Sequence, residues 1–308
     1  MQKGFIEEKI IIGTQYPLNG LLTIPETGTA SYPAVVLVHG SGPNDMDVRI
    51  GKTYIFKDLA EGLAKHGIAV LRYHKRTFVY LKEWEKNFHL GMTVKEEYIE
   101  DAVHATNLLR NDPRIDQSRI FVLGHSQGGM LAPRIDAEGG NFAGLIIMAG
   151  TPRKMEEVYA DQQDDSIKDL NVFIKWIANK QIKKIRETFN RLYDMTDEEA
   201  KTVSVHGKFM SAYYFKEMGQ KPAVKYLKKL CKPILVMQGD TDFTGSLEKD
   251  FESYKDILKD HPDATFKLYP GLNHLFMPSV YGNNIRKGVK EYYKAQKVEE
   301  YVIKDIAD

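Results

Sequence analysis

The chain has 308 residues, of which 43% are hydrophobic and 28% are charged, as in an ordinary globular protein. Its 43 Lys and Arg residues nearly balance its 42 Asp and Glu residues, so the sequence lacks the net positive charge that attracts nucleic acid or anionic lipid. Cys231 is the only cysteine, which excludes an internal disulfide and a cysteine-rich metal site.

The first residues, Met1 to Lys9, carry charges where a secretory signal needs an apolar run. The most apolar stretches, 34–38 and 145–149, have the length of a strand and are far too short to span a bilayer. We therefore expect a cytoplasmic protein with no membrane partner and, from its charge, no nucleic-acid partner.

Residues 5–12 and 20–24 have the pattern of two short strands, and a turn around Pro17, Asn19 and Gly20 predicts that they form an antiparallel hairpin. Continuously apolar runs follow at 34–38, 68–71, 120–123, 144–149 and 234–238, and a further strand is predicted at 264–269. Helical patterns lie at 54–66, 94–110, 246–259 and 284–304. Apolar strands that alternate with helices indicate an α/β fold with a mostly parallel central sheet and flanking helices.

The segment 152–230 separates two predicted strands and is much longer than the about 2–6 residues of an ordinary strand–helix connection. Its apolar residues must bury some surface, among them Val172, Phe173, Ile174, Trp176 and Ile177. We therefore predict a core of residues 1–151 and 231–308, with 152–230 inserted as a helical cap. A separate binding domain is the alternative.

The strand at 120–123 leads into Gly124-His125-Ser126-Gln127-Gly128, and a helix is predicted to follow from Met130. Glycines two residues before and after a serine permit a tight, strained turn that projects the hydroxyl above the carboxyl edge of a sheet. The strand–turn–helix context favours Ser126 as a nucleophile over a glycine-rich turn without a role.

A serine hydroxyl needs an adjacent base, which is itself oriented by a carboxylate, and both follow the serine in this arrangement. The histidines after Ser126 are His206, His261 and His274. His206 lies inside the predicted cap and His261 at the entrance to a strand. His274 follows the strand 264–269 and therefore lies on the same sheet edge as Ser126, so we predict that it is the base.

Two acids, Asp240 and Asp242, follow the strand 234–238 and are candidates to orient the base. Asp240 has the position of a residue that shapes the turn. Asp242 lies beyond the turn and is better placed to reach an imidazole, so we favour Asp242, although the spacing by itself leaves both open.

A tetrahedral intermediate also needs backbone donors for its oxyanion. The N–H of Gln127 is one predicted donor, and the N–H of Ser41, in the glycine-containing loop after the strand 34–38, is the other. We assign His39 and Gly40 of this loop to substrate binding, with His39 supporting the loop rather than acting as a second base. A phosphate-binding loop is excluded, because no Gly-Lys-Ser/Thr follows.

The blocks His39-Gly40, Gly124-x-Ser126-x-Gly128, Gly239-x-x-Asp242 and Gly271-x-x-His274 resemble the α/β-hydrolase superfamily over nearly the whole chain. The stretch Leu71 to Arg76 and the helical insertion are similar to its bacterial carboxylesterase and serine-aminopeptidase-like branch. The resemblance implies a serine–aspartate–histidine triad, no metal or organic cofactor and a lid over the acyl pocket. It also implies an acid three residues after the strand-end glycine, which supports Asp242.

The chain departs from that branch at His74, where an aspartate is usual, and at Thr77, where a glycine is usual. The segment 75–95 is longer and more aromatic than a plain connection, through Tyr80, Trp84, Phe88 and His89. These aromatic residues form either a substrate-binding wall or the packing of a loop.

The sequence therefore predicts a serine hydrolase that cleaves small carboxylic esters through an acyl-enzyme on Ser126. One alternative is an aminopeptidase or amidase on the same triad, which needs a group such as Glu217 or Glu198 to hold a substrate amine. Another is a non-catalytic binding protein of this fold. A dehalogenase or an epoxide hydrolase is disfavoured, because both need a carboxylate at position 126. Assembly into a homo-oligomer is left open.

Overall fold

The computed structural model describes residues 4–26, 28, 31–168, 170–207, 209–282 and 284–308. Its centre is an eight-stranded sheet in the order β1-β2-β6-β3-β7-β8-β11-β12. The strands are β1 (Phe5–Ile12), β2 (Leu18–Pro25), β3 (Tyr32–Val38), β6 (Ala69–Tyr73), β7 (Ile115–His125), β8 (Leu145–Met148), β11 (Ile234–Gly239) and β12 (Ala264–Tyr269). Strand β2 is antiparallel to β1 and to β6, and all other pairs are parallel.

The N-terminal hairpin is confirmed, but its turn lies earlier than predicted. Asn19 and Gly20 belong to β2, where they pair with Ile11 and Ile10. The chain instead turns directly after Gly13, whose φ of 72° is in the left-handed region. Gly20 is needed inside the strand, because a Cβ there would lie 2.6 Å from the carbonyl oxygen of Arg72 in β6.

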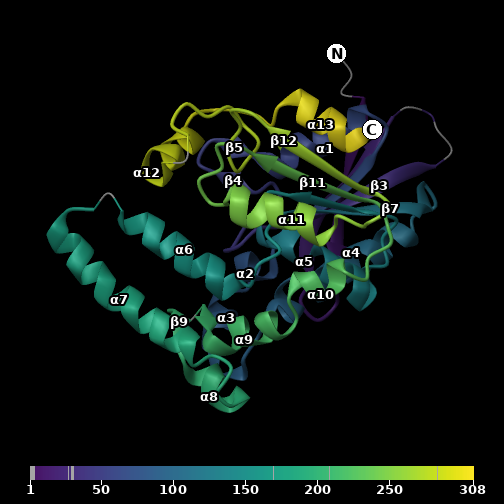
Figure 1. Cartoon of the computed structure of the whole chain (residues 1–308). Helices are drawn as coiled ribbons and strands as arrows, with labels where there is room; N and C mark the ends of the chain where they lie inside the picture. Colours follow the sequence, from purple (N-terminus) through teal and green to yellow (C-terminus); the bar gives the residue numbers. More distant parts are fainter. Residues whose placement is uncertain (1–3, 27, 29–30, 169, 208, 283) are drawn as a thin grey trace.

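Helices cover both faces of the sheet, which explains why its central strands are apolar without alternation. Helices α1 and α13 lie on one face, and α4, α5 and α10 lie on the other (Figure 1). The core helices are α1 (Ile55–Lys65), α2 (Arg76–Val79), α3 (Leu81–Lys86), α4 (Glu100–Arg110), α5 (Gln127–Ile135), α11 (Glu252–Ile257), α12 (Ile285–Gly288) and α13 (Glu300–Ala307). Single π- or 3-10 turns adjoin them at Phe88–Leu90, Lys95–Ile99, Asp136–Gly140, Leu247–Phe251 and Val289–Tyr293.

The prediction of a single helix over 284–304 is wrong. The chain forms α12 and a 3-10 turn, then continues without helix until α13 begins at Glu300. The N–H of Val298 donates to Asp58 of α1 at 3.2 Å, and the Val298 side chain is buried. Packing against α1 therefore takes precedence over the helical pattern in this segment.

The segment between β8 and β11 is mostly helical, as expected. It contains α6 (Met155–Ile167), α7 (Val172–Asn190), α8 (Asp197–Thr202), α9 (Ala212–Gln220) and α10 (Ala223–Leu227). Two short strands, β9 (Ser204–His206) and β10 (Met210–Ser211), pair within it, as β4 (Arg49–Ile50) and β5 (Thr53–Tyr54) do in the core. Its role as a cap stays a prediction.

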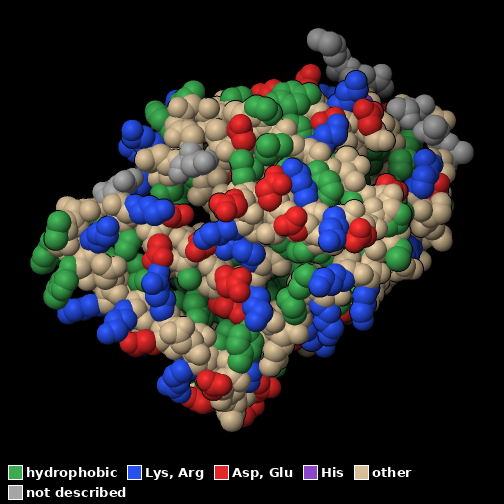
Figure 2. Space-filling model, in the orientation of Figure 1, with side chains coloured by type: hydrophobic (Ala, Val, Ile, Leu, Met, Phe, Trp, Pro, Cys, Tyr) green, Lys and Arg blue, Asp and Glu red, His purple; other side chains and the backbone are tan. Residues whose placement is uncertain are grey.

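Helix α7 projects from the body of the molecule, and its first turns are not buried as expected (Figure 1). The side chains of Val172, Phe173 and Trp176 are 87%, 69% and 56% exposed. Hydrophobic side chains accordingly lie on the surface at the outer end of this arm (Figure 2). The later residues Ile182 and Ile185 are buried, because only that part of the helix packs against its neighbours. None of the helices in the described part of the chain has the length and apolar character needed to cross a membrane.

Candidate active site

Ser126 lies in a strained turn between β7 and α5. Its φ of 56° and ψ of −117° are unfavourable for any residue with a side chain. The turn is also too tight for side chains at the flanking glycines. A Cβ on Gly124 would lie 2.2 Å from the carbonyl oxygen of Gly128, and one on Gly128 would lie 2.3 Å from that of Val38. Local packing thus explains the glycine spacing and fixes the serine at the carboxyl end of β7.

His274 and Asp242 meet at the same edge of the sheet, in the loops after β12 and β11. The N–H at Nδ1 of His274 donates to Oδ2 of Asp242 at 2.7 Å. The Asp242 side chain is buried, and burial raises its pKa. The charge of His274 and hydrogen bonds from His274 and Thr244 outweigh burial, so that the pKa falls to about 2. The carboxylate is therefore ionised at neutral pH and can stabilise an imidazolium.

Asp240 does not reach the imidazole. Its Oδ1 instead accepts a hydrogen bond from the backbone N–H of Gly271 at 2.6 Å. Asp240 therefore ties together the loops after β11 and β12. Of the two acids that the sequence leaves open, the structure brings only Asp242 to His274.

His274 and the turn of Ser126 are linked through His125, which sequence reasoning missed. Its Nε2–H donates to the carbonyl oxygen of His274 at 3.0 Å, and the two rings lie 4.7 Å apart. Burial lowers the pKa of His125 to about 3, so this ring is neutral. Among the hydrogen bonds of the described residues, none joins Ser126 Oγ to His274. Such a bond often tightens only when substrate is present, and Nε2 of His274 is the nitrogen that Asp242 leaves available.

Two further side chains hold Asp242 and were also missed. The Thr244 hydroxyl donates to Asp242 Oδ1 at 2.7 Å and lies 2.6 Å from Nδ1 of His274. The amide of Gln238 donates to Asp242 Oδ2 at 2.6 Å. Both lie within four residues of Asp242 in the sequence, but neither type of residue has a spacing that marks it as a partner.

Of the two predicted oxyanion donors, Gln127 follows Ser126 directly, and Ser41 lies in the loop that packs against Ser126. Gly40 packs directly against the serine, since a Cβ on Gly40 would lie 3.1 Å from Ser126 Cβ. No backbone hydrogen bond among the described residues uses the N–H of Ser41. Gln127 is the first residue of α5, where the N–H groups have no acceptor within the helix. Both N–H groups are therefore available to a ligand.

His39 is buried and packs between the rings of Phe56 and Tyr73, each at 5.2 Å. Burial lowers its pKa to about 3, so the ring is neutral. The position of His39 favours the interpretation that it supports the loop. Two residues, His39 and Gly40, are assigned to substrate binding, and only Gly40 lies against Ser126.

The model of the serine aminopeptidase S33 family matches residues 32–278, which is most of the chain. The chain belongs to this family. The resemblance to the α/β-hydrolases that the motifs indicate is therefore confirmed, and so is the α/β-hydrolase fold.

Individual members are similar over nearly the whole chain. Esterase EstD of Thermotoga maritima is 39% identical over 303 residues, which cover 98% of this chain and 66% of that protein. The chain thus spans just under two thirds of this relative. An esterase of Pyrococcus furiosus matches with a TM-score of 0.55 and 15% identity, covering 94% of this chain and 88% of its own. Est1E of Butyrivibrio proteoclasticus matches with a TM-score of 0.53 and 16% identity, covering 97% and 99%. The last two similarities establish the fold alone.

The aminopeptidase alternative predicts an acid for the substrate amine, and both candidate acids have partners within the chain. Glu217 is buried and accepts from both terminal nitrogens of Arg134, at 2.9 and 2.5 Å. Glu198 lies on α8 and accepts from Lys201 at 2.6 Å, but its side chain is 83% exposed, so this surface pair leaves the carboxylate accessible. The buried pair with Arg134 disfavours Glu217 as the group that holds a substrate amine, whereas the role of Glu198 stays a prediction.

The aromatic side chains of segment 75–95 mainly pack against other parts of the chain. Trp84 is buried and donates through Nε1 to the carbonyl oxygen of Phe209 at 3.0 Å. The Tyr80 hydroxyl donates to the carbonyl oxygen of Pro17 at 2.9 Å. These contacts favour loop packing over a substrate-binding wall.

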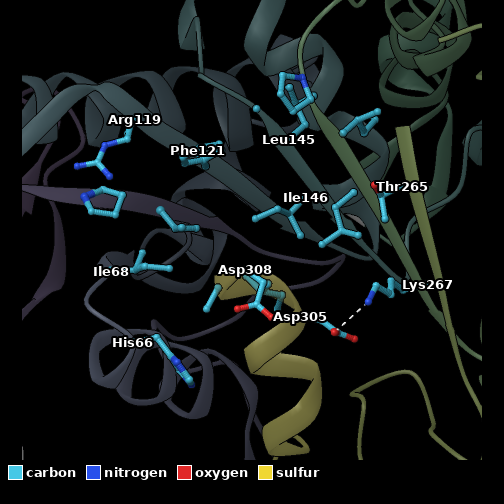
Figure 3. A pocket seen from close by; sticks show the side chains of 18 of the residues that line it. His66, Ile68, Arg119, Phe121, Leu145, Ile146, Thr265, Lys267, Asp305 and Asp308 are labelled. Atoms are coloured by element: carbon cyan, nitrogen blue, oxygen red, sulfur yellow. Dashed lines mark hydrogen bonds and ion pairs between the residues drawn. The ribbon is translucent and has the colours of Figure 1, made fainter. Parts of the chain in front are cut away.

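A cavity of about 570 Å³ lies at the opposite edge of the sheet, beside α13 (Figure 3). It is lined by residues near the amino ends of the parallel strands, among them Phe121, Ile146 and Thr265. None of the predicted site residues lines it. Within the described residues, no group of three or more His, Cys, Asp or Glu side chains could hold a metal.

Proposed function

We propose that the chain is a serine hydrolase that cleaves small carboxylic esters. The observation that carries the proposal is the His274–Asp242 hydrogen bond of 2.7 Å, on the same sheet edge as the strained Ser126. Membership of a serine hydrolase family and the 39% identity to Esterase EstD support the assignment.

The proposed reaction has two stages. Ser126 Oγ attacks the ester carbonyl while Nε2 of His274 takes its proton, and Asp242 stabilises the imidazolium. The N–H groups of Ser41 and Gln127 bind the oxyanion. Collapse of the intermediate expels the alcohol, which His274 protonates. Water, deprotonated by His274, then attacks the acyl-enzyme and releases the acid and Ser126.

The segment 152–230 is proposed to be a lid over the acyl pocket, because it leaves the sheet at the carboxyl end of β8, on the edge that carries the site. A cytoplasmic location stays a prediction, and assembly into a homo-oligomer stays open.

A substrate panel tests the proposal against the peptidase alternative. We expect nitrophenyl esters of short acyl chains to be hydrolysed at least about 100-fold faster than aminoacyl nitroanilides, because Glu217, the buried one of the two acids predicted to hold an amine, is already paired with Arg134. Ser126→Ala is the matched control and should abolish both activities. Preference for the anilides would establish the peptidase instead, and no turnover of either class by the wild type would favour a binding protein.

A further inference from the structure

Lys75, just after β6, is buried beneath the loop that carries Ser41. Its side chain is 1% exposed, and Nζ donates to the carbonyl oxygens of Gly40 and Gly42 at 3.0 and 2.9 Å. A buried ammonium is costly unless it is paired and hydrogen bonded. Here Glu97 Oε1 lies 2.9 Å away and the Tyr98 hydroxyl 2.5 Å away. The charge is therefore compensated at a position that has no access to solvent.

The partners of Lys75 also reach the second predicted oxyanion donor. The Tyr98 hydroxyl lies 2.9 Å from both the Gly40 carbonyl oxygen and Oε1 of Gln127. The Gln127 amide donates to the Tyr214 hydroxyl at 3.0 Å, and this hydroxyl donates to Glu97 at 2.6 Å. A closed ring of buried hydrogen bonds thus links the loop after β3 to the first residue of α5.

The geometry of the peptide bond gives this ring a consequence for the site. A trans peptide is planar, so the carbonyl of Gly40 and the N–H of Ser41 point in opposite directions. Fixing the carbonyl on Lys75 therefore fixes the direction of the N–H. A carbonyl that accepts from an ammonium is also polarised, which makes the N–H of the same peptide a stronger donor.

We propose that Lys75 is a positioning residue for the oxyanion hole, and that Glu97 and Tyr98 hold it in place. The inference rests on the proposed function. Lys75 acts through the peptide between Gly40 and Ser41 and does not touch substrate. It therefore contributes in the transition state, when the oxyanion has formed, and little in the bound ester.

The test compares Lys75→Met with the double variant Lys75→Met/Glu97→Gln, which leaves no buried charge unpaired. We expect both to lower kcat by about 10- to 100-fold, somewhat less than loss of an oxyanion donor itself, with KM within about threefold. Inhibition by a trifluoromethyl ketone, which forms a tetrahedral oxyanion, should weaken by the same factor as kcat/KM. Tyr98→Phe keeps the Lys75–Glu97 pair. It should lower kcat and weaken the inhibitor in the same way, but by smaller factors.

Lys216→Met is the matched control. Lys216 is also a buried ammonium, 2.7 Å from Asp197 Oδ1, but it has no contact with the oxyanion loop, so its kcat should equal that of the wild type. The positioning role is overturned if kcat of Lys75→Met stays within twofold of the wild-type value. It is also overturned if KM rises by the same factor by which the inhibitor binds more weakly. If the lysine variants do not fold, an unchanged kcat in Tyr98→Phe overturns it. A wild type that hydrolyses no ester overturns the proposed function as well.

Discussion

Replacement of Asp242 by Asn is expected to lower kcat for ester hydrolysis by about 10⁴-fold. The asparagine amide has no charge to stabilise the imidazolium, and it can hold His274 in the tautomer that leaves no free Nε2 lone pair. The buried carboxylate accepts from His274 at 2.7 Å, so the loss should be in kcat rather than in KM. Steady-state hydrolysis of a short nitrophenyl ester measures it.

Asp240→Asn is the matched control for this prediction. Asp240 accepts only from the Gly271 backbone among the described residues, and an asparagine oxygen can accept the same bond. We expect kcat to stay within a few-fold of the wild type. A large loss of kcat in Asp240→Asn together with a small loss in Asp242→Asn would show that Asp240, and not Asp242, orients the base.

Asp242 should also contribute to the dependence of stability on pH. Its pKa is about 2 in the folded chain, below the usual 3.8, so its contribution is present above pH 4. The contribution is lost as the pH falls toward about 2. Asp242→Asn should therefore lose less stability over this range than the wild type.

Replacement of Gly128 by Ala is expected to reduce the free energy of unfolding by about 3 kcal/mol. The added Cβ would lie 2.3 Å from the carbonyl oxygen of Val38 and 2.5 Å from that of His39. Both atoms belong to the backbone, so relief requires β3 and α5 to separate. That movement also displaces Ser126, and kcat should fall at least about 100-fold. Urea unfolding and ester hydrolysis measure the two effects.

Gly67→Ala separates close packing from backbone conformation. Gly67 has a φ of +81°, but no atom lies within 4 Å of a Cβ built there. Its replacement should lower the free energy of unfolding by only about 1–2 kcal/mol and leave kcat unchanged. Equal stability and equal activity of the two variants would contradict the tight turn around Ser126.

The sheet could be predicted from the sequence because buried parallel strands are continuously apolar. The central strands β3, β6, β7, β8 and β11 therefore lie where the apolar runs do. The position of Ser126, Asp242 and His274 at one edge of the sheet could be predicted, because each follows a strand and the carboxyl ends of parallel strands meet at one edge.

The rest depends on contacts between residues that are distant in the chain. Lys75 holds Gly40 across 35 positions, and His125 holds the backbone of His274 across 149. No local pattern marks either contact. The C-terminal helix is likewise interrupted because Val298 donates to Asp58, and the apolar start of α7 is exposed although its composition predicts burial.

We infer that Ser126 is an activated nucleophile. Labelling of the folded chain with a fluorophosphonate, followed by peptide mapping, tests it most directly, because only an activated serine reacts rapidly with this probe. We predict one labelled residue, Ser126, and no labelling of Ser126→Ala or of chain that is denatured before the probe is added. No labelling of the folded wild type, or labelling at another serine, would contradict the claim.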